Sequence, residues 1–356
     1  MRNGAWAAGA ADPRRRPLVT VLGASGLIGC ALTRELARRP IRLRVVSRRP
    51  TPAPASAEAD IEVRTADLTE AGALADAVAD ADAVVHLVAH MTDATRWRLD
   101  ADDTFAERVN LGLVRELVEL LRRDAAAAVA PGPAPVVLFA GTVSQVGLSA
   151  RERIDGSESD APTGAYDRQK LAAEHLLKRA TAEGALCGIS LRMPTVFGHE
   201  PHAPALDRGV VSTMIRRALA GEPLTLWHDG SVLRDLLHVD DVARAFVAAL
   251  DHAGSLGGGH WLLGSGRAER LDEVFAKIAG AVSARTGRPP VPVHSVAAPA
   301  QAEVTDFHSY EIDSSAFRAV TGWRPRVPLD EALGRTVSTL ALDGRHRLPS
   351  GKGGPS

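Results

Sequence analysis

The most constraining feature of this sequence is a short turn that carries three glycines at fixed spacing, Gly23, Gly26 and Gly29. An apolar run at residues 18–23 (LVTVLG) precedes the turn, and a stretch with helical periodicity at 27–39 follows it. Glycine at these positions allows a tight turn, close approach of a pyrophosphate to backbone N–H groups, and tight packing of the helix on the strand. A chain with 32 glycines also produces this spacing by chance, so the flanking strand and helix carry the interpretation. The turn predicts a dinucleotide-binding unit, with an ordinary glycine-rich turn as the alternative.

Strands and helices alternate over the first half of the chain. Such alternation predicts an α/β fold with a doubly wound parallel sheet, the Rossmann arrangement. The predicted strands lie at 18–23, 41–47, 61–68, 82–90, 135–141 and 185–192, and the predicted helices at 27–39, 71–79, 104–124 and 165–181.

Beyond residue 192 the regular alternation ends, and helical stretches are mixed with short strands and long loops. Helices are expected at 209–220, 240–251, 271–284 and 329–342. We expect a dinucleotide-binding domain at 18–192, to which later segments cross back, and a smaller C-terminal α/β substrate-binding region at 193–344. The segments 1–17 and 345–356 are predicted to be disordered tails.

Composition excludes several classes of protein. The 42 basic and 43 acidic residues leave a net charge of −1, which gives no global attraction to nucleic acid or anionic lipid. No run of about 18 apolar residues is present, so we expect no membrane span. Cys30 and Cys187 are too few for a disulfide framework. Residues 1–17 lack the apolar stretch of a secretory signal, so a cytoplasmic protein is expected.

The end of the second predicted strand indicates which dinucleotide is bound. An acidic residue at this point usually accepts a hydrogen bond from the ribose 2′-hydroxyl of NAD. Here the sequence is Ser47-Arg48-Arg49. Because a guanidinium pairs with a 2′-phosphate through charge-assisted hydrogen bonds, we predict NADP(H). The alternative is a solvated basic turn in an arginine-rich protein.

Tyr166 and Lys170 form the strongest single pattern. The chain has two tyrosines and four lysines, so a tyrosine followed by a lysine four residues later is rare by chance. On a helix these positions share one face. An ammonium near a phenol is expected to lower the pKa of the tyrosine, which then exchanges a proton with a carbonyl or alcohol oxygen.

A third member of the site is expected at the end of the strand at 135–141. Thr142 and Ser144 both place a hydroxyl at the carboxyl end of a parallel strand, where ligands bind. Either hydroxyl would hold the substrate oxygen beside Tyr166. Asn110 is interpreted either as a structural residue or as the anchor of a helix bend or a water.

These residues together resemble the extended short-chain dehydrogenase/reductase family over residues 18–342. The segments RDLLHVDDVA (234–243), GEPLTLWHDG (221–230) and TGWRPRVPLDEAL (321–333) are similar to its nucleotide-sugar epimerases, dehydratases and reductases. Within that subgroup the chain is most similar to dTDP-4-keto-6-deoxyhexose 4-ketoreductases of antibiotic deoxysugar pathways.

The resemblance implies a role for each matching residue. Thr142, Tyr166 and Lys170 would be catalytic, Asp67 would contact adenine, Pro194 would lie near the nicotinamide, and Ser144 and Arg234 would bind substrate, Arg234 at its diphosphate. The dinucleotide would be bound by Gly23, Ser25, Gly26, Leu27, Ile28, Gly29, Ser47, Arg48, Arg49, Asp67, Leu68, Leu87, Val88, Ala89, Tyr166, Lys170 and Pro194.

Departures from the family pattern narrow the reaction. Related dehydratases carry an acidic pair directly after the catalytic threonine, where this chain has Val143 and Ser144. Dehydration therefore lacks its acid and base. Val146 and Phe197 stand where the family usually has tyrosine, and neither change removes the proton donor.

The resemblance implies NADPH-dependent reduction of the C4 ketone of a dTDP-linked 4-keto-6-deoxyhexose. The alternative is a nucleotide-sugar 4-epimerase with tightly bound NAD. A protein that only senses a dinucleotide is disfavoured, because the tyrosine–lysine pair is retained. A homodimer is expected by family analogy. The twelve histidines show no metal-binding spacing, so we expect no metal site.

Overall fold

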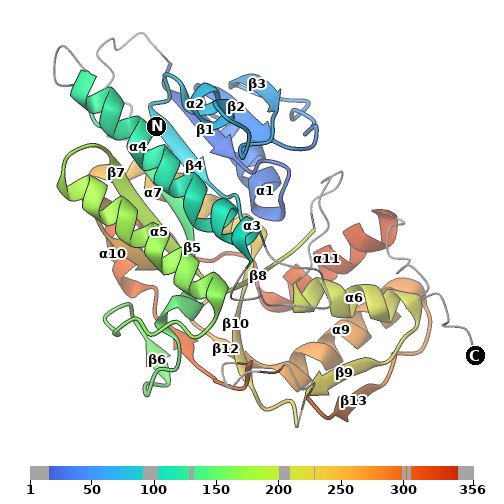
Figure 1. Ribbon diagram of the computed structural model, residues 1–356. Coiled ribbons are helices and arrows are strands. Elements are labelled where there is room, and N and C mark those ends of the chain that lie inside the picture. The colour runs from blue at the N-terminus through green and yellow to red at the C-terminus, as the bar shows by residue number, and fades with distance from the viewer. Residues whose placement is uncertain are drawn as a thin grey trace, which may run out of the picture.

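A computed structural model describes residues 16–90, 103–127, 132–199, 209–227, 229–298, 302 and 306–343. Apart from residues 16 and 17, the predicted tails lie outside these ranges. The central element is a parallel seven-stranded sheet in the order β11-β7-β5-β4-β1-β2-β3 (Figure 1). Its strands are β1 (Leu18–Leu22), β2 (Arg42–Ser47), β3 (Asp60–Thr65), β4 (Ala83–His86), β5 (Val136–Thr142), β7 (Cys187–Met193) and β11 (His260–Leu262). The predicted doubly wound parallel sheet is confirmed.

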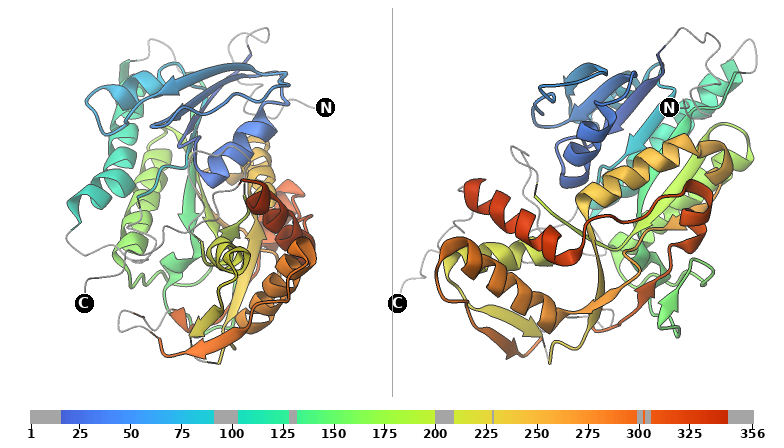
Figure 2. Two further views of the ribbon diagram at one scale, coloured as in Figure 1. Left: turned by 90° about the vertical axis from the view of Figure 1, so that its right-hand side faces the viewer. Right: turned by 180° about the vertical axis from the view of Figure 1, so that it is seen from behind.

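The central strands are buried because helices cover both faces of the sheet. β1 and β4 are continuous apolar runs, which is typical of strands covered on both sides. On one face lie α2 (Ala73–Val78), α4 (Leu113–Ala127) and α5 (Ala165–Ala182); on the other lie α1 (Leu27–Leu36) and α7 (Val239–Asp251) (Figures 1 and 2). The edge strand β3 has the charged sequence DIEVRT and is mostly exposed, which discourages pairing with another chain.

Two predicted helices differ from the structure at their ends or in their interior. The helix expected at 27–39 ends at Leu36, and the next residues form a turn before Pro40, because a residue that precedes proline disfavours the helical conformation. The helix expected at 104–124 consists of α3 (Thr104–Glu107), a π-helical turn at Arg108–Gly112, and α4. Asn110 lies inside that π-helical turn.

The C-terminal region supplies a second apolar core and small sheets. Its three-stranded sheet contains β8 (Thr195–Phe197), β10 (Leu233–His238) and β12 (Ala268–Arg270), and a two-stranded sheet pairs β9 (Leu224–Trp227) with β13 (Val293–Val296). Helices α6 (Val210–Ala220), α9 (Leu271–Thr286) and α11 (Leu329–Asp343) pack together beside these strands (Figure 2). Short strands β6 (Arg153–Ile154) and β14 (Glu311–Ile312) form a further pair.

Several late segments return to the large sheet. β11 pairs with β7 at its edge, and α7, α8 (Ala253–Leu256) and α10 (Ser315–Thr321) pack against its core. The chain therefore crosses between the two regions more than once. No helix in the described part of the chain has the length and apolar character needed to cross a membrane.

Candidate active site

The glycine turn packs tightly between β1 and α1. Gly23 has φ of +90°, a conformation that side chains rarely adopt, and its N–H donates to the Val46 carbonyl at 2.9 Å. A Cβ on Gly29 would lie 2.3 Å from the Gly23 carbonyl oxygen, closer than real side chains approach. The nearest atom to a Cβ on Gly26 is the same oxygen, at 3.4 Å. Gly29 is therefore required by packing, whereas Gly26 leaves room at the helix start for a ligand.

A cavity of about 200 Å³ opens directly beside this turn. Its walls come from the ends of β1, β2, β3 and β4, where a Rossmann sheet binds the adenosine part of a dinucleotide. Predicted residues that line it are Gly23, Ser25, Gly26, Ser47, Arg48, Asp67, Leu68, Leu87, Val88 and Ala89. Predicted dinucleotide-binding residues that do not line it are Leu27, Ile28, Gly29, Arg49, Tyr166, Lys170 and Pro194.

The two arginines after β2 are placed differently. Arg48 lines the cavity with an exposed side chain, and Arg49 is exposed but does not line it. The hydroxyl of Ser47 donates to the Arg49 carbonyl oxygen at 2.7 Å and lies 2.9 Å from the Thr51 hydroxyl. Ser47 therefore shapes the turn, and Arg48 is the cation that faces the space.

Asp67 is held in place at the end of β3. One of its carboxylate oxygens accepts hydrogen bonds from the Thr69 N–H at 2.9 Å and the Thr69 hydroxyl at 2.7 Å. These hydrogen bonds lower the pKa of Asp67, and the positive charges of Arg48 and Arg108 act in the same direction. Asp67 is therefore an ionised acceptor at neutral pH.

Sequence reasoning missed part of the cavity wall. Ala66, Thr69, His90, Phe105, Val109 and Leu113 also line it.

Asn110 holds the π-helical turn at Arg108–Gly112 beside this cavity through three hydrogen bonds. Its amide oxygen accepts from the His90 N–H at 2.7 Å, and its amide nitrogen donates to the His90 carbonyl at 3.0 Å and to Gln169 Oε1 at 2.8 Å. Asn110 therefore fixes the π-helical turn to the loop after β4 on one side and to α5 on the other.

Tyr166 and Lys170 lie on the first turns of α5. The Lys170 ammonium is buried and donates to the Ala140 carbonyl at 3.0 Å, and its nitrogen is 5.6 Å from the centre of the Tyr166 ring. Burial lowers the pKa of Lys170 to about 7. Burial also raises the pKa of Tyr166, and the charge of Asp167 raises it further. The expectation that Lys170 lowers the pKa of Tyr166 is therefore wrong for this arrangement, because burial and the Asp167 charge both raise it.

Thr142 and Ser144 meet α5 at the carboxyl end of β5. The Thr142 and Ser144 hydroxyl oxygens are 2.7 Å apart, and the Ser144 hydroxyl donates to Asp167 Oδ1 at 2.5 Å. Thr142 also caps a short 3₁₀ helix, Val143–Val146, by accepting from the Ser144 N–H at 3.3 Å. The predicted hydroxyls and the Tyr166 helix are thus brought together.

A buried polar network behind Thr142 was not predicted. The Gln145 side-chain oxygen accepts from the Thr142 N–H at 2.9 Å, and its amide nitrogen donates to Glu174 at 3.1 Å. The Glu174 carboxylate also accepts hydrogen bonds from Lys178, Ser190 and Arg192. Glu174 and Arg192 are each 0% exposed. The network ties the backbone of Thr142 to α5 and β7.

Arg234 lies on β10, and its guanidinium donates to backbone carbonyls of Leu233, Asp306 and His308. Tyr310 is half-buried near it; burial raises the pKa of Tyr310, whereas the Arg234 charge lowers it. The guanidinium thus holds the segment at 306–308, and its pairing with a substrate diphosphate remains a prediction.

Residues 19–264, more than half of the chain, match the NAD dependent epimerase/dehydratase family. The chain belongs to this family. It is accordingly an NAD(P)-dependent enzyme that acts on nucleotide sugars.

The relatives of this family member include enzymes of two reaction types. A dTDP-L-rhamnose 4-epimerase from Burkholderia thailandensis is 27% identical over 91% of this chain and 95% of the relative. A dTDP-6-deoxy-L-talose 4-dehydrogenase (NAD(P)(+)) from Kitasatospora kifunensis is 29% identical over 88% of this chain and 93% of the relative. A crystal structure of UDP-glucose 4-epimerase from Thermus thermophilus in complex with NAD is similar with a TM-score of 0.73 and 25% identity, and it covers 90% of this chain and 98% of that one.

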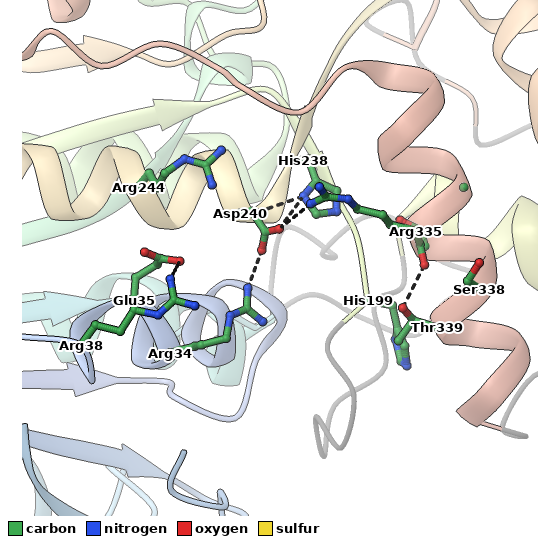
Figure 3. Close-up of a pocket in the computed structure, with 12 residues that line it drawn as sticks. Arg34, Glu35, Arg38, His199, His238, Asp240, Arg244, Arg335, Ser338 and Thr339 are labelled. Carbon is green, nitrogen blue, oxygen red and sulfur yellow. Dashed lines mark hydrogen bonds and ion pairs between the residues drawn. The ribbon is translucent and has the colours of Figure 1, made fainter. Parts of the chain in front are cut away.

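A second cavity, of about 660 Å³, lies away from the glycine turn, between α1, α7 and α11 (Figure 3). Asp240 from the HVDD segment reaches into it and binds Arg34 of α1 and Arg335 of α11. Arg38 pairs with Glu35 at 3.1 Å. The guanidinium groups in this cavity thus have carboxylate partners. Asp240 joins the two regions of the enzyme rather than binding the predicted dinucleotide.

The histidines of this family member do not form a metal site among the described residues. No group of three His, Cys, Asp or Glu side chains suited to a metal ion is found there. His86 is buried at the end of β4, and burial lowers its pKa to about 3, so its ring is neutral. His199 Nε2 lies 2.7 Å from Asp343 Oδ2. His202 and His228 fall outside the described residues.

Proposed function

We propose that this enzyme exchanges hydride at C4 of a dTDP-linked 6-deoxyhexose. The observation that carries the proposal is that Thr142, Lys170 and the helix that bears Tyr166 meet at the carboxyl edge of the same sheet whose neighbouring strands line the cavity beside the glycine turn. Two relatives matched over most of their length support the choice of carbon and sugar. The sugars in their names, L-rhamnose and 6-deoxy-L-talose, differ in configuration only at C4.

The residues present fit a nicotinamide dinucleotide. Gly26 leaves space at the start of α1, whose N–H groups favour a pyrophosphate, and Asp67 and Arg48 face the adenosine end. When bound, NAD(P)(H) supplies or accepts the hydride. Tyr166 donates a proton to the C4 oxygen during reduction or removes one during oxidation, and Thr142 holds that oxygen. Lys170 adds a positive charge near the developing oxyanion.

Two forms of this chemistry are compatible with the residues. Net reduction of a 4-ketone by NADPH is supported by Arg48, which lines the cavity, and by the absence of an acidic residue at positions 47–49. Epimerisation returns hydride to the same carbon and uses tightly bound NAD, and several relatives that are 4-epimerases support it. A homodimer and a role in antibiotic deoxysugar formation are parts of the proposal that rest on family analogy.

Net reduction and epimerisation differ in whether they consume a cofactor. Purified enzyme is incubated with NADPH and a panel of dTDP-4-keto-6-deoxyhexoses, and separately with dTDP-L-rhamnose without added cofactor. Reduction predicts one NADPH oxidised for each C4 hydroxyl formed. Epimerisation predicts NAD co-purifying with the protein, and dTDP-6-deoxy-L-talose appearing in the product NMR spectrum without net cofactor use. Turnover of neither substrate set would contradict the proposed C4 chemistry.

The position of Arg48 predicts the cofactor preference. We expect wild-type enzyme to use NADPH with higher kcat/KM than NADH, and Arg48→Ala to lower kcat/KM for NADPH by about 10- to 100-fold, because a charge-assisted hydrogen bond contributes about 1.5–3 kcal/mol. Efficiency with NADH should change little. Arg49→Ala is the matched control, since Arg49 does not line the cavity, and its effect should be smaller. A wild-type NADPH to NADH ratio below one would refute the preference.

A further inference from the structure

We infer that Asp167 is the terminal proton acceptor of a hydrogen-bonded chain that begins at Thr142 and passes through Ser144. The Thr142 and Ser144 oxygens are 2.7 Å apart, and Ser144 Oγ is 2.5 Å from Asp167 Oδ1. The inference rests on the proposed C4 chemistry and adds a second proton route beside Tyr166. Asp167 acts through the two hydroxyls, so it is a positioning residue and a proton store rather than a catalytic residue.

The direction of each hydrogen bond follows from counting hydrogens. An ionised carboxylate only accepts, so the single hydroxyl hydrogen of Ser144 points to Asp167. The hydrogen between the two hydroxyls must then come from Thr142. One lone pair of Thr142 faces the Ser144 N–H at 3.3 Å, and the other is free to accept from a substrate hydroxyl. With Asp167 ionised, Thr142 is therefore set to receive a proton.

The proton transfer balances in both directions. During oxidation, the C4–H bond breaks with loss of hydride to an oxidised nicotinamide dinucleotide, and the C4 oxygen forms its second bond to carbon. The hydroxyl proton passes to Thr142, the Thr142 proton to Ser144, and the Ser144 proton to Asp167. During reduction, protonated Asp167 returns a proton along the same chain, and the new C4 alkoxide receives one from Thr142.

The surroundings of Asp167 explain why a second route is useful. The carboxylate raises the pKa of its neighbour Tyr166 and also that of Tyr310, which approaches from the segment before β14. A phenol with a raised pKa stays protonated at neutral pH, so it is not in the form that accepts a proton. Cationic side chains of this region include Arg168 and Lys170, on the same helix, and Arg234 of β10, which lies beside Tyr310. The ionised Asp167 carboxylate, reached through Ser144, is therefore the available acceptor for the alcohol proton.

The first test needs no turnover. Infrared difference spectra of wild-type and Asp167→Asn enzyme, recorded across pH, report the ionisation of the Asp167 carboxyl. Because the Ser144 hydroxyl donates to the ionised form, we expect Ser144→Ala to move this ionisation to higher pH. In Ser144→Thr, which keeps a hydroxyl, the Asp167 carboxyl should ionise at the same pH as in the wild-type enzyme. An unchanged ionisation in Ser144→Ala would overturn the inference, whatever reaction the enzyme catalyses.

The second test measures the pH dependence of oxidation in a Tyr166→Phe background, where the phenol route is absent. We expect the remaining rate to fall at acid pH as Asp167 becomes protonated. Adding Asp167→Asn should lower this rate at least about 10-fold, because general acid–base groups commonly contribute about 100-fold or more. It should also abolish the fall of the rate at acid pH, which we call the acid limb of the pH profile. A merely structural role would lower the rate but keep the acid limb. An acid limb in the double variant would therefore contradict the inference.

Glu183→Gln is the matched control for the change in charge. Glu183 lies at the other end of α5, is largely exposed and pairs with Arg122. Its substitution should leave both the infrared signal and the pH profile unchanged. If wild-type enzyme turns over no sugar in the panel, the proposed function fails while the infrared test still decides whether the proton chain exists. If turnover is normal but the pH profile does not respond to Asp167, the proton chain alone fails.

Discussion

Tyr166→Phe is expected to lower kcat for C4 hydride exchange by about 100- to 10,000-fold, the usual contribution of a positioned general acid–base group. The variant keeps the aromatic ring, so its packing on α5 should be preserved. Because burial raises the pKa of Tyr166, the phenol is protonated at neutral pH and is in the form that donates to an alkoxide. The loss should therefore be largest in the direction of ketone reduction.

Steady-state kinetics with a 4-keto sugar and NADPH measure this loss. The dissociation constant for the dinucleotide, measured by calorimetry, should stay close to the wild-type value, because phenylalanine removes a proton donor and leaves the cradle around Gly26 and Arg48 intact. A variant that retains near-full turnover would remove Tyr166 from the reaction. Weak cofactor binding with unchanged kcat would instead indicate a binding role.

Much of the fold could be predicted from local patterns. The glycine turn, the apolar runs of β1 and β4, and the alternation with helices together specify a parallel sheet, since each pattern depends on neighbouring residues only. The pair Tyr166 and Lys170 was equally visible, because positions four apart on a helix share a face. The π-helical turn at Arg108–Gly112 was not visible, since it is fixed by contacts of Asn110 with residues 20 and 59 positions away.

The part of the site that could not be predicted from the sequence consists of polar contacts between residues far apart along the chain. Asp167 looked like an ordinary residue between Tyr166 and Lys170, and only the folded chain shows that it meets Ser144, 23 residues earlier. The pKa of Tyr166 was predicted in the wrong direction for a related reason. The sequence shows both the cation four residues away and the adjacent carboxylate of Asp167, but not the burial of the phenol, which is the largest effect on its pKa.

Glu174→Gln is expected to lower the free energy of unfolding by about 3–5 kcal/mol, the usual cost of breaking a buried ion pair by removing one partner. The carboxylate accepts hydrogen bonds from Arg192, Ser190, Lys178 and Gln145, and the amide of glutamine would turn donors toward some of them. The buried Arg192 keeps Asp160 as a partner at 2.6 Å, which is why the protein should still fold.

Urea unfolding at several pH values measures the effect of Glu174→Gln and its pH dependence. Hydrogen bonds and the charge of Arg192 hold the pKa of Glu174 far below its ordinary value of 4.5 in the folded enzyme. A group with a depressed folded pKa stabilises the protein above its unfolded pKa and loses that contribution as pH falls. The difference in free energy of unfolding between wild type and Glu174→Gln should therefore have its full value at pH 7 and become smaller below about pH 4.5.

Asp330→Asn is the control, because Asp330 is 75% exposed and its ion pair with Lys277 should contribute less than about 1 kcal/mol. Equal stability losses in the two variants would show that the buried network does not hold Thr142 and α5 together.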